Sequence, residues 1–333
     1  AQKRGLPAAQ VNTPREFLES DQVTSRNWAQ ELYHPVIGKY RLPGPAFLMS
    51  KTPMKVRRPS PLLGQHQEEV IGGISQQKLP PSPYLPIQET DSPMLQGLRI
   101  ADLTRFYAGP IGTMFLGFYG AEVVKVESAE LEANRDLTRP MFADYNRSKV
   151  GCTIDARNEQ GKELLKMLIA SSDVLVDNFS AGVINRLGLG YEDIQQVKPD
   201  IVQVSMPGMG LTGPLRHWVT WGSQVMAYSG LGYLWGYPEG SVEARSKIVF
   251  ADYVGAAMLS LVVLAGLEFR DQTGQGQFVE LSLLDGQASL LGPAYLDYTV
   301  NSRDWNAMGY RETLGALHAP YGCYPCKEPE SWI

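Results

Sequence analysis

Residues 97–127 read GLRIADLTRFYAGPIGTMFLGFYGAEVVKVE, and this stretch decides the fold class. Its first apolar run, Leu98–Leu103, has the composition of a β-strand. The segment Glu122–Glu127 alternates with period two, which predicts a second strand. The glycine-punctuated segment Gly109–Tyr119 between them is predicted to be a helix. The stretch therefore predicts a strand–helix–strand unit.

The same alternation of short apolar runs and amphipathic segments continues downstream. The further predicted elements are helix Glu159–Ser171 with Asn158 as N-cap, strand Val174–Val176, a short helix at Ala181–Leu187, strand Ile201–Ser205, helix Val254–Phe269 and strand Gln277–Ser282. Strands that alternate with helices are typical of a parallel sheet with helices on both faces. We therefore predict an α/β, Rossmann-like fold.

The region before Gly97 has a different texture and contains many prolines. One helix is predicted there, Thr13–Leu32, which starts with a capping box of Thr13 and Glu16 and has Pro14 at its first position. Residues 76–96 are predicted to be a proline-rich linker, because proline fixes φ and restricts the residue before it. The sequence thus divides into residues 1–75, 76–96 and 97–333. It begins with alanine and ends in an apparent strand, so we expect a fragment of a longer protein.

Composition excludes several classes of function. The 333 residues carry 30 Lys and Arg against 35 Asp and Glu, a net charge of −5, which argues against a nucleic-acid-binding protein. No apolar run approaches the roughly 20 residues of a membrane span. The most apolar segment, Val254–Leu267, is interrupted by glycine and serine and is predicted to be a buried helix. Three cysteines and no signal peptide predict a cytoplasmic protein without a disulfide framework.

Familiar cofactor and metal motifs do not occur in the sequence. There is neither a G-x-G-x-x-G fingerprint after the first predicted strand nor a P-loop. Cys323 and Cys326 have the spacing of zinc ligands but no second pair, so we expect two buried thiols and no metal. No tightly bound cofactor is predicted.

Asp252 is the one acidic residue whose position invites a chemical interpretation. It lies directly before the apolar helix, and no other acidic residue follows until Glu268. Two interpretations stay open on the residues alone. Asp252 is either an N-cap or a partner of the helix dipole, or it is a carboxylate nucleophile held by the N–H groups at the start of a helix.

A set of motifs in a fixed order extends over about 180 residues. They are Leu103–Pro110 (LTRFYAGP), Gly120–Glu127 (GAEVVKVE), Asp173–Gly182 (DVLVDNFSAG), Arg186–Gly190 (RLGLG), Gly210–Pro214 (GLTGP), Asp252 with Gly255 in a D-x-x-G pattern, Thr273–Gln277 (TGQGQ) and Ser282–Asp285 (SLLD). In this order they resemble the family III CoA-transferases, which include formyl-CoA and carnitine CoA-transferases.

The resemblance implies that Asp252 is the catalytic aspartate. It would attack the thioester of an acyl-CoA to give an aspartyl anhydride, which CoA thiolate converts to an aspartyl-CoA thioester, and a small carboxylate would then accept the CoA. CoA and acyl-CoA are therefore expected as substrates. The CoA-binding positions that carry over are Tyr107, Ala108, Ile154, Arg157, Asn178, Phe179, Ser180 and Arg186.

Two departures from the family pattern bear on specificity. Ser128 stands where an arginine is often found, and residues 220–223 replace a segment that often carries a basic and an acidic residue near the catalytic aspartate. The racemases of the family have a histidine where this chain has Trp221–Gly222, so a racemase is not expected. His217 lies a few residues too early to replace that histidine.

The N-terminal region resembles the C-terminal tail of another unit of the same family, through motifs such as Gly44–Phe47 and Arg58–His66. The tail then precedes the head, which predicts a tandem protein with residues 97–333 as the large domain of the second unit. In single-unit relatives two ring-like subunits interlock. We therefore expect either an interlocked homodimer or an intramolecular pairing of two units.

Aromatic residues concentrate shortly before Asp252. We interpret Trp218, Trp221, Tyr233, Trp235 and Tyr237 as candidates for a substrate pocket, either a cage for a methylated cation or ordinary hydrophobic packing. A cage would suit dimethylsulfoniopropionate, the substrate of a two-unit transferase and lyase of this family that releases dimethyl sulfide.

Besides the CoA-transferase and the transferase with lyase activity, a third alternative for the function of the chain is a non-catalytic scaffold half of a tandem protein.

Overall fold

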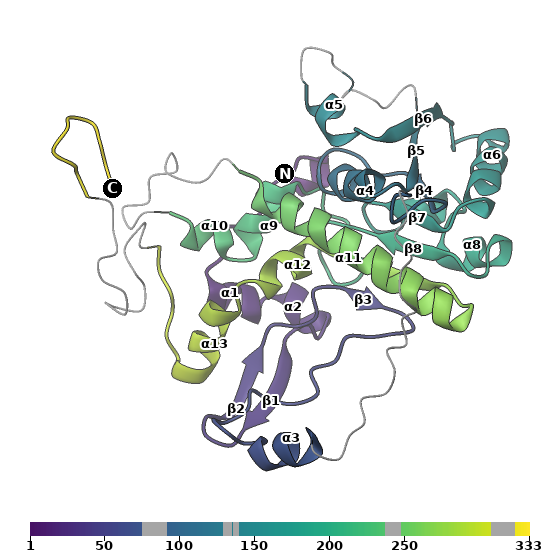
Figure 1. Cartoon of the computed structure of the whole chain (residues 1–333). Coiled ribbons are helices and arrows are strands. Elements are labelled where there is room, and N and C mark those ends of the chain that lie inside the picture. The colour runs from purple at the N-terminus through teal and green to yellow at the C-terminus, as the bar shows by residue number, and fades with distance from the viewer. Residues whose placement is uncertain (75–91, 129–134, 136–139, 237–247, 308–323) are drawn as a thin grey trace.

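The computed structural model describes residues 1–74, 92–128, 135, 140–236, 248–307 and 324–333. Its central feature is a seven-stranded sheet of order β3-β9-β8-β7-β4-β5-β6, in which every neighbouring pair is parallel except β3 with β9 (Figure 1). The strands are β3 (Leu48–Met49), β4 (Arg99–Asp102), β5 (Glu122–Glu127), β6 (Lys149–Thr153), β7 (Val174–Asp177), β8 (Val202–Ser205) and β9 (Gln277–Glu280). The predicted Rossmann-like α/β class is confirmed.

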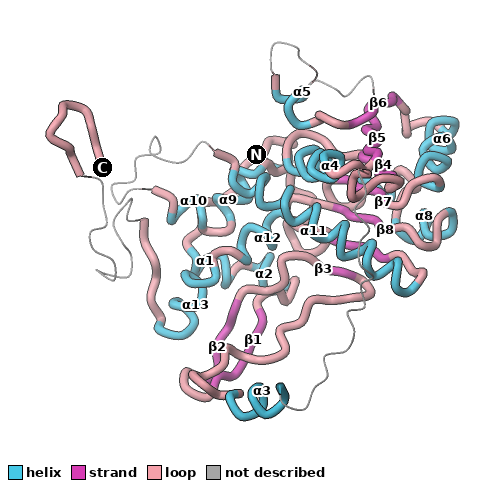
Figure 2. The backbone as a smooth tube through the Cα atoms, in the orientation of Figure 1, coloured by secondary structure: helices cyan, strands magenta, loops and turns pink. Residues whose placement is uncertain are grey.

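Helices cover both faces of this sheet, and two separate hydrophobic clusters mark the faces. One cluster joins the sheet to α4 (Ala108–Phe118) and α11 (Phe250–Thr273). The other joins it to α6 (Glu159–Ala170), α7 (Val183–Arg186) and α8 (Tyr191–Val197). In Figure 2 these helices lie on either side of the strands.

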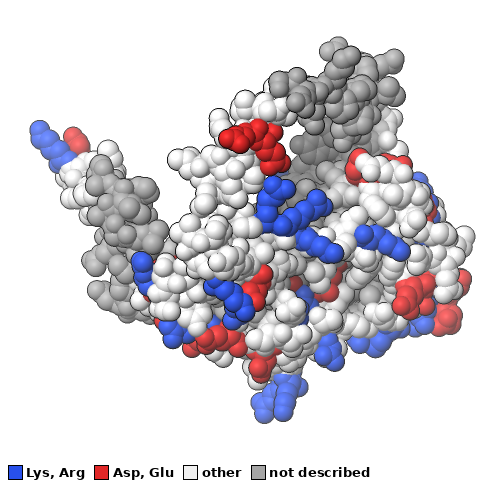
Figure 3. Space-filling view, turned by 90° about the horizontal axis from the view of Figure 1, so that it is seen from below, with Lys and Arg blue, Asp and Glu red and all other residues white. Residues whose placement is uncertain are grey.

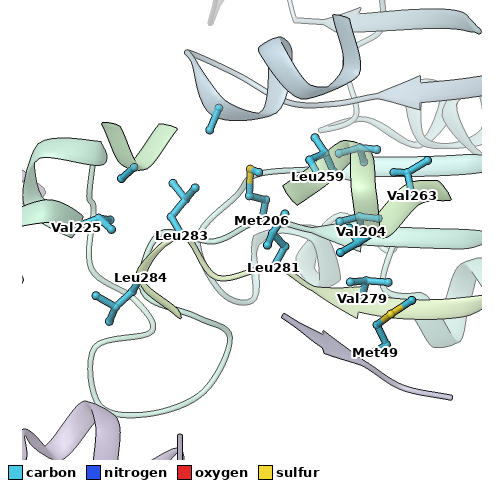
Figure 4. Close-up of a cluster of buried hydrophobic side chains, with 14 of the residues drawn as sticks. Met49, Val204, Met206, Val225, Leu259, Val263, Val279, Leu281, Leu283 and Leu284 are labelled. Atoms are coloured by element: carbon cyan, nitrogen blue, oxygen red, sulfur yellow. The ribbon is translucent and has the colours of Figure 1, made fainter. Parts of the chain in front are cut away.

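The long helix α11 is the core element of the first face. Figure 4 shows Leu259 and Val263 of α11 beside Val204 of β8, and Met49 of β3 beside Val279 of β9. By length and composition α11 is the one helix among the described residues that could cross a membrane. Its buried side packs on α4 and β8, as a core helix of a globular protein does.

The remaining described elements lie around the sheet, with α5 near the edge strand β6 and the N-terminal elements on the side of β3 (Figure 1). They are a 3₁₀ turn (Gln2–Arg4), α1 (Pro14–Glu19), α2 (Asp21–Ser25), β1 (Gln30–His34), β2 (Gly38–Leu42), α3 (Gln67–Ile74), α5 (Met141–Tyr145), α9 (Gly222–Tyr228), α10 (Leu231–Leu234), α12 (Leu283–Ser289) and α13 (Gly292–Asn301). Strands β1 and β2 form a separate antiparallel hairpin.

The predicted helix Thr13–Leu32 is wrong in extent. The capping box of Thr13 and Glu16 is present, but the helix ends at Glu19 because Ser20 adopts an extended conformation. The Ser20 side chain then caps the next short helix by accepting the Val23 N–H. The chain turns again and enters β1, so residues 30–32 belong to a strand.

The N-terminal segment is part of the main core. Phe17 is fully buried and stacks on Tyr295 of α13 with ring centroids 5.4 Å apart. Arg26 Nη2 lies 2.8 Å from Glu280 Oε1 and 2.5 Å from Asp285 Oδ2, and all three side chains are buried. Residues 1–50 and the sheet therefore form one folded body.

The packing adds detail to two of the predicted elements. Strand β5 is buried along most of its length, including Lys125 and Glu127, because a parallel sheet is covered on both faces and need not alternate. In α6, Asn158 caps the helix as predicted, and Leu165 and Ile169 are buried, whereas Leu164 is 49% exposed.

Figure 3 shows that Lys and Arg form a central group on the face seen there, with acidic side chains on either side.

Candidate active site

Asp252 is the third residue of α11, because this helix begins at Phe250, four residues earlier than predicted. The N-cap position belongs to Val249, so the N-cap interpretation of Asp252 is wrong. The Ala108 N–H, at the first residue of the neighbouring helix α4, instead faces the Asp252 carboxylate and lowers its pKa. Its environment is therefore made by other elements of the fold.

The start of α9 forms the other wall around Asp252. A Cβ on Gly222 would lie 1.9 Å from Asp252 Oδ2 and 2.3 Å from Val249 Cγ1, so only glycine leaves room for the carboxylate. The carboxylate is thus enclosed between the first residues of α4, α9 and α11. Gly222, within the segment 220–223 where the sequence departs from the family pattern, therefore lies at Asp252.

The electrostatics of this position favour a carboxylate of raised basicity. Asp252 is 8% exposed. Burial raises its pKa to about 6, and the neighbouring Ala108 N–H opposes the rise. Among the described residues no Lys or Arg forms an ion pair with it. At neutral pH the group is still mostly ionised, and a carboxylate without a salt-bridge partner keeps its electron pairs available for attack.

The turn between β4 and α4 brings Ala108 to this position. Phe106 in this turn has φ 64°, a left-handed conformation that costs a non-glycine residue about 1 kcal/mol or more. Asn178, which follows β7, holds the turn from the other side. Its Oδ1 accepts the Arg105 N–H at 2.8 Å, and its Nδ2 donates to the Arg105 carbonyl at 2.7 Å.

A cavity of about 480 Å³, including its open mouth, lies at the carboxyl ends of β4, β5, β6 and β7. In doubly wound sheets, ligands bind in the crevice at this edge, where the strand order reverses. Here β5 and then β6 lie on one side of β4, whereas β7, β8 and β9 follow one another on its other side. The strand order therefore reverses between β4 and β7. The lining residues are Leu103, Arg105, Val126, Glu127, Ser128, Ile154, Asp155, Ala156, Arg157, Leu165, Phe179 and Leu187.

Three of the eight predicted CoA-binding residues meet in this cavity, namely Ile154, Arg157 and Phe179. The Arg105 guanidinium lies 5.8 Å from the centre of the Phe179 ring. Arg157 is 2.8 Å from Asp155, and the buried Ser128 hydroxyl has no hydrogen-bond partner among the described residues. The cavity thus offers a flat apolar wall, two guanidinium groups and an unused hydroxyl.

The other predicted CoA-binding residues have different surroundings. Tyr107 and Ala108 lie at the start of α4, near Asp252, and Asn178 holds the Arg105 backbone. Ser180 and Arg186 do not line the cavity, and Arg186 is exposed. Sequence reasoning missed Arg105, Glu127 and Gly222. Arg105 and Glu127 lie inside the quoted motifs. The signal that could have identified them is their position at the carboxyl end of β5 or just after that of β4.

The aromatic candidates do not gather into one pocket. Trp218 packs edge-to-face on Tyr228, which belongs to the hydrophobic core with Phe17. The Tyr233 hydroxyl donates to Asn306 Oδ1 at 2.8 Å.

Two of the aromatic candidates lie beside residues that flank Asp252. Trp235 packs on Phe250, two residues before Asp252, and Trp221 is exposed at the start of α9. Tyr237 lies outside the described residues.

The expectation of two buried thiols is wrong for the cysteine that the structure describes. Cys326 is a free, exposed thiol rather than a buried one, and Cys323 lies outside the described residues. Within the described ranges, no cluster of three or more His, Cys, Asp or Glu side chains could hold a metal ion.

The fold and site define a doubly wound α/β protein with a crevice at its strand ends and a buried carboxylate nearby. The model of CoA-transferase family III matches residues 1–67 and 95–333. The chain belongs to this family.

Similar proteins agree with this assignment. The mouse succinyl-CoA:glutarate CoA-transferase is 33% identical over 242 residues, 70% of this chain and 55% of that protein. The alpha subunit of the succinyl-CoA–L-malate CoA-transferase of Chloroflexus aurantiacus is 30% identical over 60% of this chain and 50% of its own length. A CAIB/BAIF family protein from Brucella suis has a similar structure, with a TM-score of 0.65 and 28% identity over 70% of this chain and 64% of that one. The chain spans about half the length of the curated relatives it matches.

Proposed function

We propose that this chain carries the nucleophile of an enzyme that transfers CoA from an acyl-CoA donor to a small carboxylate acceptor. The observation that carries the proposal is the Asp252 carboxylate, which is buried, forms no ion pair among the described residues, and faces the Ala108 N–H. The turn that presents Ala108 also presents Arg105 to the cavity. One short turn therefore connects the carboxylate with the cavity, in which we place the nucleotide part of CoA.

The proposed reaction begins with attack of an Asp252 oxygen on the thioester carbonyl carbon. The carbon–sulfur bond breaks, CoA leaves as the thiolate, and a mixed anhydride forms. The thiolate then attacks the aspartyl carbonyl carbon and releases the donor acid, which leaves an aspartyl-CoA thioester. The acceptor carboxylate repeats both steps in reverse order, so Asp252 is regenerated and no oxidant or reductant is needed.

The environment of Asp252 suits this sequence of steps. The raised pKa makes the carboxylate a stronger nucleophile than an ordinary aspartate, and a value of about 6 still leaves it mostly ionised at neutral pH. The Ala108 N–H can also donate to the oxygen that gains charge during attack on the aspartyl carbonyl, as a preformed donor does in other acyl transfers. Enclosure between three helix starts limits access of water to the anhydride.

Transfer and trapping test the proposal together. The chain is incubated with succinyl-CoA and glutarate or L-malate, and the CoA esters are separated by chromatography. Hydroxylamine is added in parallel, and peptides are analysed by mass spectrometry for a hydroxamate at residue 252. Asp252→Asn must abolish both signals, and Asp271→Asn, on the exposed last turn of the same helix, must leave them unchanged. Absence of any adduct in the native chain would favour the scaffold alternative instead.

We further propose that residues 1–75 are the tail of a preceding unit, joined by residues 76–96 to the large domain of a second unit. The family match to two separate stretches supports this arrangement. Such a unit would pair with a second copy of its fold, within one chain or between chains. Sedimentation analysis of the chain tests pairing between chains: a stable dimer supports it, and a monomer at all concentrations contradicts it.

The free thiols Cys152 and Cys326 support a reducing, cytoplasmic location.

A further inference from the structure

Three charged side chains are buried together beneath the turn that presents Ala108. They are Asp102 at the end of β4, Lys125 opposite it on β5 and Lys149 at the start of β6. The side chains of Asp102, Lys125 and Lys149 are 0%, 4% and 1% exposed. Burial of charge is costly, and a buried ion pair seldom stabilises a fold as well as apolar residues of the same volume. This cluster therefore needs an explanation beyond stability.

The cluster binds the turn on the N-terminal side of Ala108. Asp102 Oδ1 accepts the Thr104 N–H at 2.8 Å and the Thr104 hydroxyl. Lys125 Nζ donates to the Thr104 carbonyl. Every polar group of Thr104 is thus fixed by the cluster, two residues before the strained Phe106.

The cluster also binds the first turn of α4, on the C-terminal side of Ala108. Lys149 Nζ donates to the Pro110 carbonyl at 2.9 Å and to Asp102 Oδ2 at 2.9 Å. The Thr113 hydroxyl donates to the same Asp102 oxygen at 2.8 Å. Ala108 is therefore held from both sides, and Asn178 fixes Arg105 between them.

A phenylalanine in the left-handed conformation persists only where its surroundings hold it, and such strain commonly occurs at functional sites. Thr104 even lies where a Cβ on Gly109 would stand, 2.4 Å from Thr104 Cβ, so the turn is packed tightly onto the cluster. We propose that Lys125, together with Asp102 and Asn178, is a positioning residue that forces the turn into the strained form in which the Ala108 N–H meets Asp252. The proposal rests on the proposed role of Asp252.

Lys125→Met is the informative substitution. It removes the bond to the Thr104 carbonyl but leaves Asp102 and Lys149 as a one-to-one ion pair, so the fold is expected to survive. Asn178→Ala loosens the same turn from its half-buried side and serves as the test variant if Lys125→Met does not fold. Val263→Ala is the matched control, because it opens a cavity in the middle of α11 and loses stability without touching the turn.

The first readout is the pKa of Asp252, measured by ¹³C NMR on protein labelled at the aspartate carboxyl, with Asp252→Asn to assign the signal. Displacement of the Ala108 N–H from the carboxylate should raise this pKa by about half a unit or more. The second readout is the rate of hydroxamate formation at residue 252, which should fall about tenfold or more, since misplacement of a catalytic group by about 1 Å can cost a hundredfold.

The two readouts separate this inference from the proposed function. A raised pKa and a slower adduct in Lys125→Met and Asn178→Ala, but not in Val263→Ala, support the positioning role. An unchanged Asp252 pKa in both variants overturns it, whatever the adduct does. If the native chain forms no adduct while the pKa still shifts, the proposed function fails and the positioning role stands.

Discussion

The burial of Asp252 predicts that its replacement by asparagine stabilises the protein, but only at higher pH. The pKa of Asp252 is about 6 in the folded protein, against 3.8 for an ordinary aspartate. The native state therefore binds more protons than the unfolded state between these values, and stability falls as pH rises from about 4 to about 6. A difference of about two units corresponds to a loss of about 3 kcal/mol, which is complete above pH 6.

Asparagine has the same shape and keeps an oxygen for the Ala108 N–H, but it carries no charge to desolvate. Asp252→Asn should therefore raise the free energy of unfolding at pH 8 by up to about 3 kcal/mol, or the melting temperature by roughly 5 °C. The difference should vanish near pH 4, where the native aspartic acid is also neutral.

Urea unfolding followed by circular dichroism, at several pH values between 4 and 8, measures this difference directly. Asp271→Asn on the exposed end of α11 serves as the control and should show no such dependence on pH. Because the pKa of Asp285 is raised by burial to about 7 in both proteins, its own contribution cancels. A variant that is equally stable or less stable than the native protein at pH 8 would refute the assigned environment of Asp252.

Three single contacts carry the remaining predictions. Gly222→Ala places a Cβ 1.9 Å from Asp252 Oδ2, so the rate of adduct formation should fall at least about tenfold and the free energy of unfolding by about 1–3 kcal/mol. The control is Gly73→Ala, where a Cβ meets nothing within 4 Å, and it should behave as the native chain. Arg26→Met leaves the buried carboxylates of Glu280 and Asp285 without a cation, so the free energy of urea unfolding should fall by about 3–5 kcal/mol at pH 8. The loss should be smaller at pH 5, because protonation of a carboxylate relieves the repulsion. A small effect at both pH values would contradict the buried ion-pair cluster. Arg157 is the cation that we propose for the 3′-phosphate of CoA, which dephospho-CoA lacks. Arg157→Gln should therefore weaken CoA binding about tenfold by calorimetry and have little effect on the binding of dephospho-CoA, and equal losses for both ligands would place the phosphate elsewhere.

Much of the sheet was predictable because its strands and helices follow one another in strict alternation. Strand β5 was predicted to the residue, and α4 and β9 within two residues. The N-terminal helix was overextended because its apolar periodicity continues past Ser20. The pair Ser20–Asp21 was the available signal, since serine followed by an acidic residue is a typical start of a new helix.

The proposed nucleophile could be singled out from sequence, but its environment could not. The D-x-x-G pattern pointed to Asp252, yet the start of α11 was placed too late because Val249 and Phe250 look like ordinary apolar residues before a cap. The partners of Asp252 come from positions 108 and 222, and no local pattern connects residues so far apart. Lys125 illustrates the same limit, because an alternating strand predicts an exposed lysine, whereas coverage of both faces buries it.

The central claim is that the Asp252 carboxylate becomes covalently acylated and is regenerated in every transfer. A single turnover with an acceptor labelled with ¹⁸O in both carboxylate oxygens tests it most directly. Thiolate attack on the acceptor side of the second anhydride leaves the bridging oxygen on the aspartate. The peptide that contains residue 252 should therefore gain one ¹⁸O atom by mass spectrometry. Product formation without ¹⁸O in that peptide, or with ¹⁸O at another residue, would contradict the account.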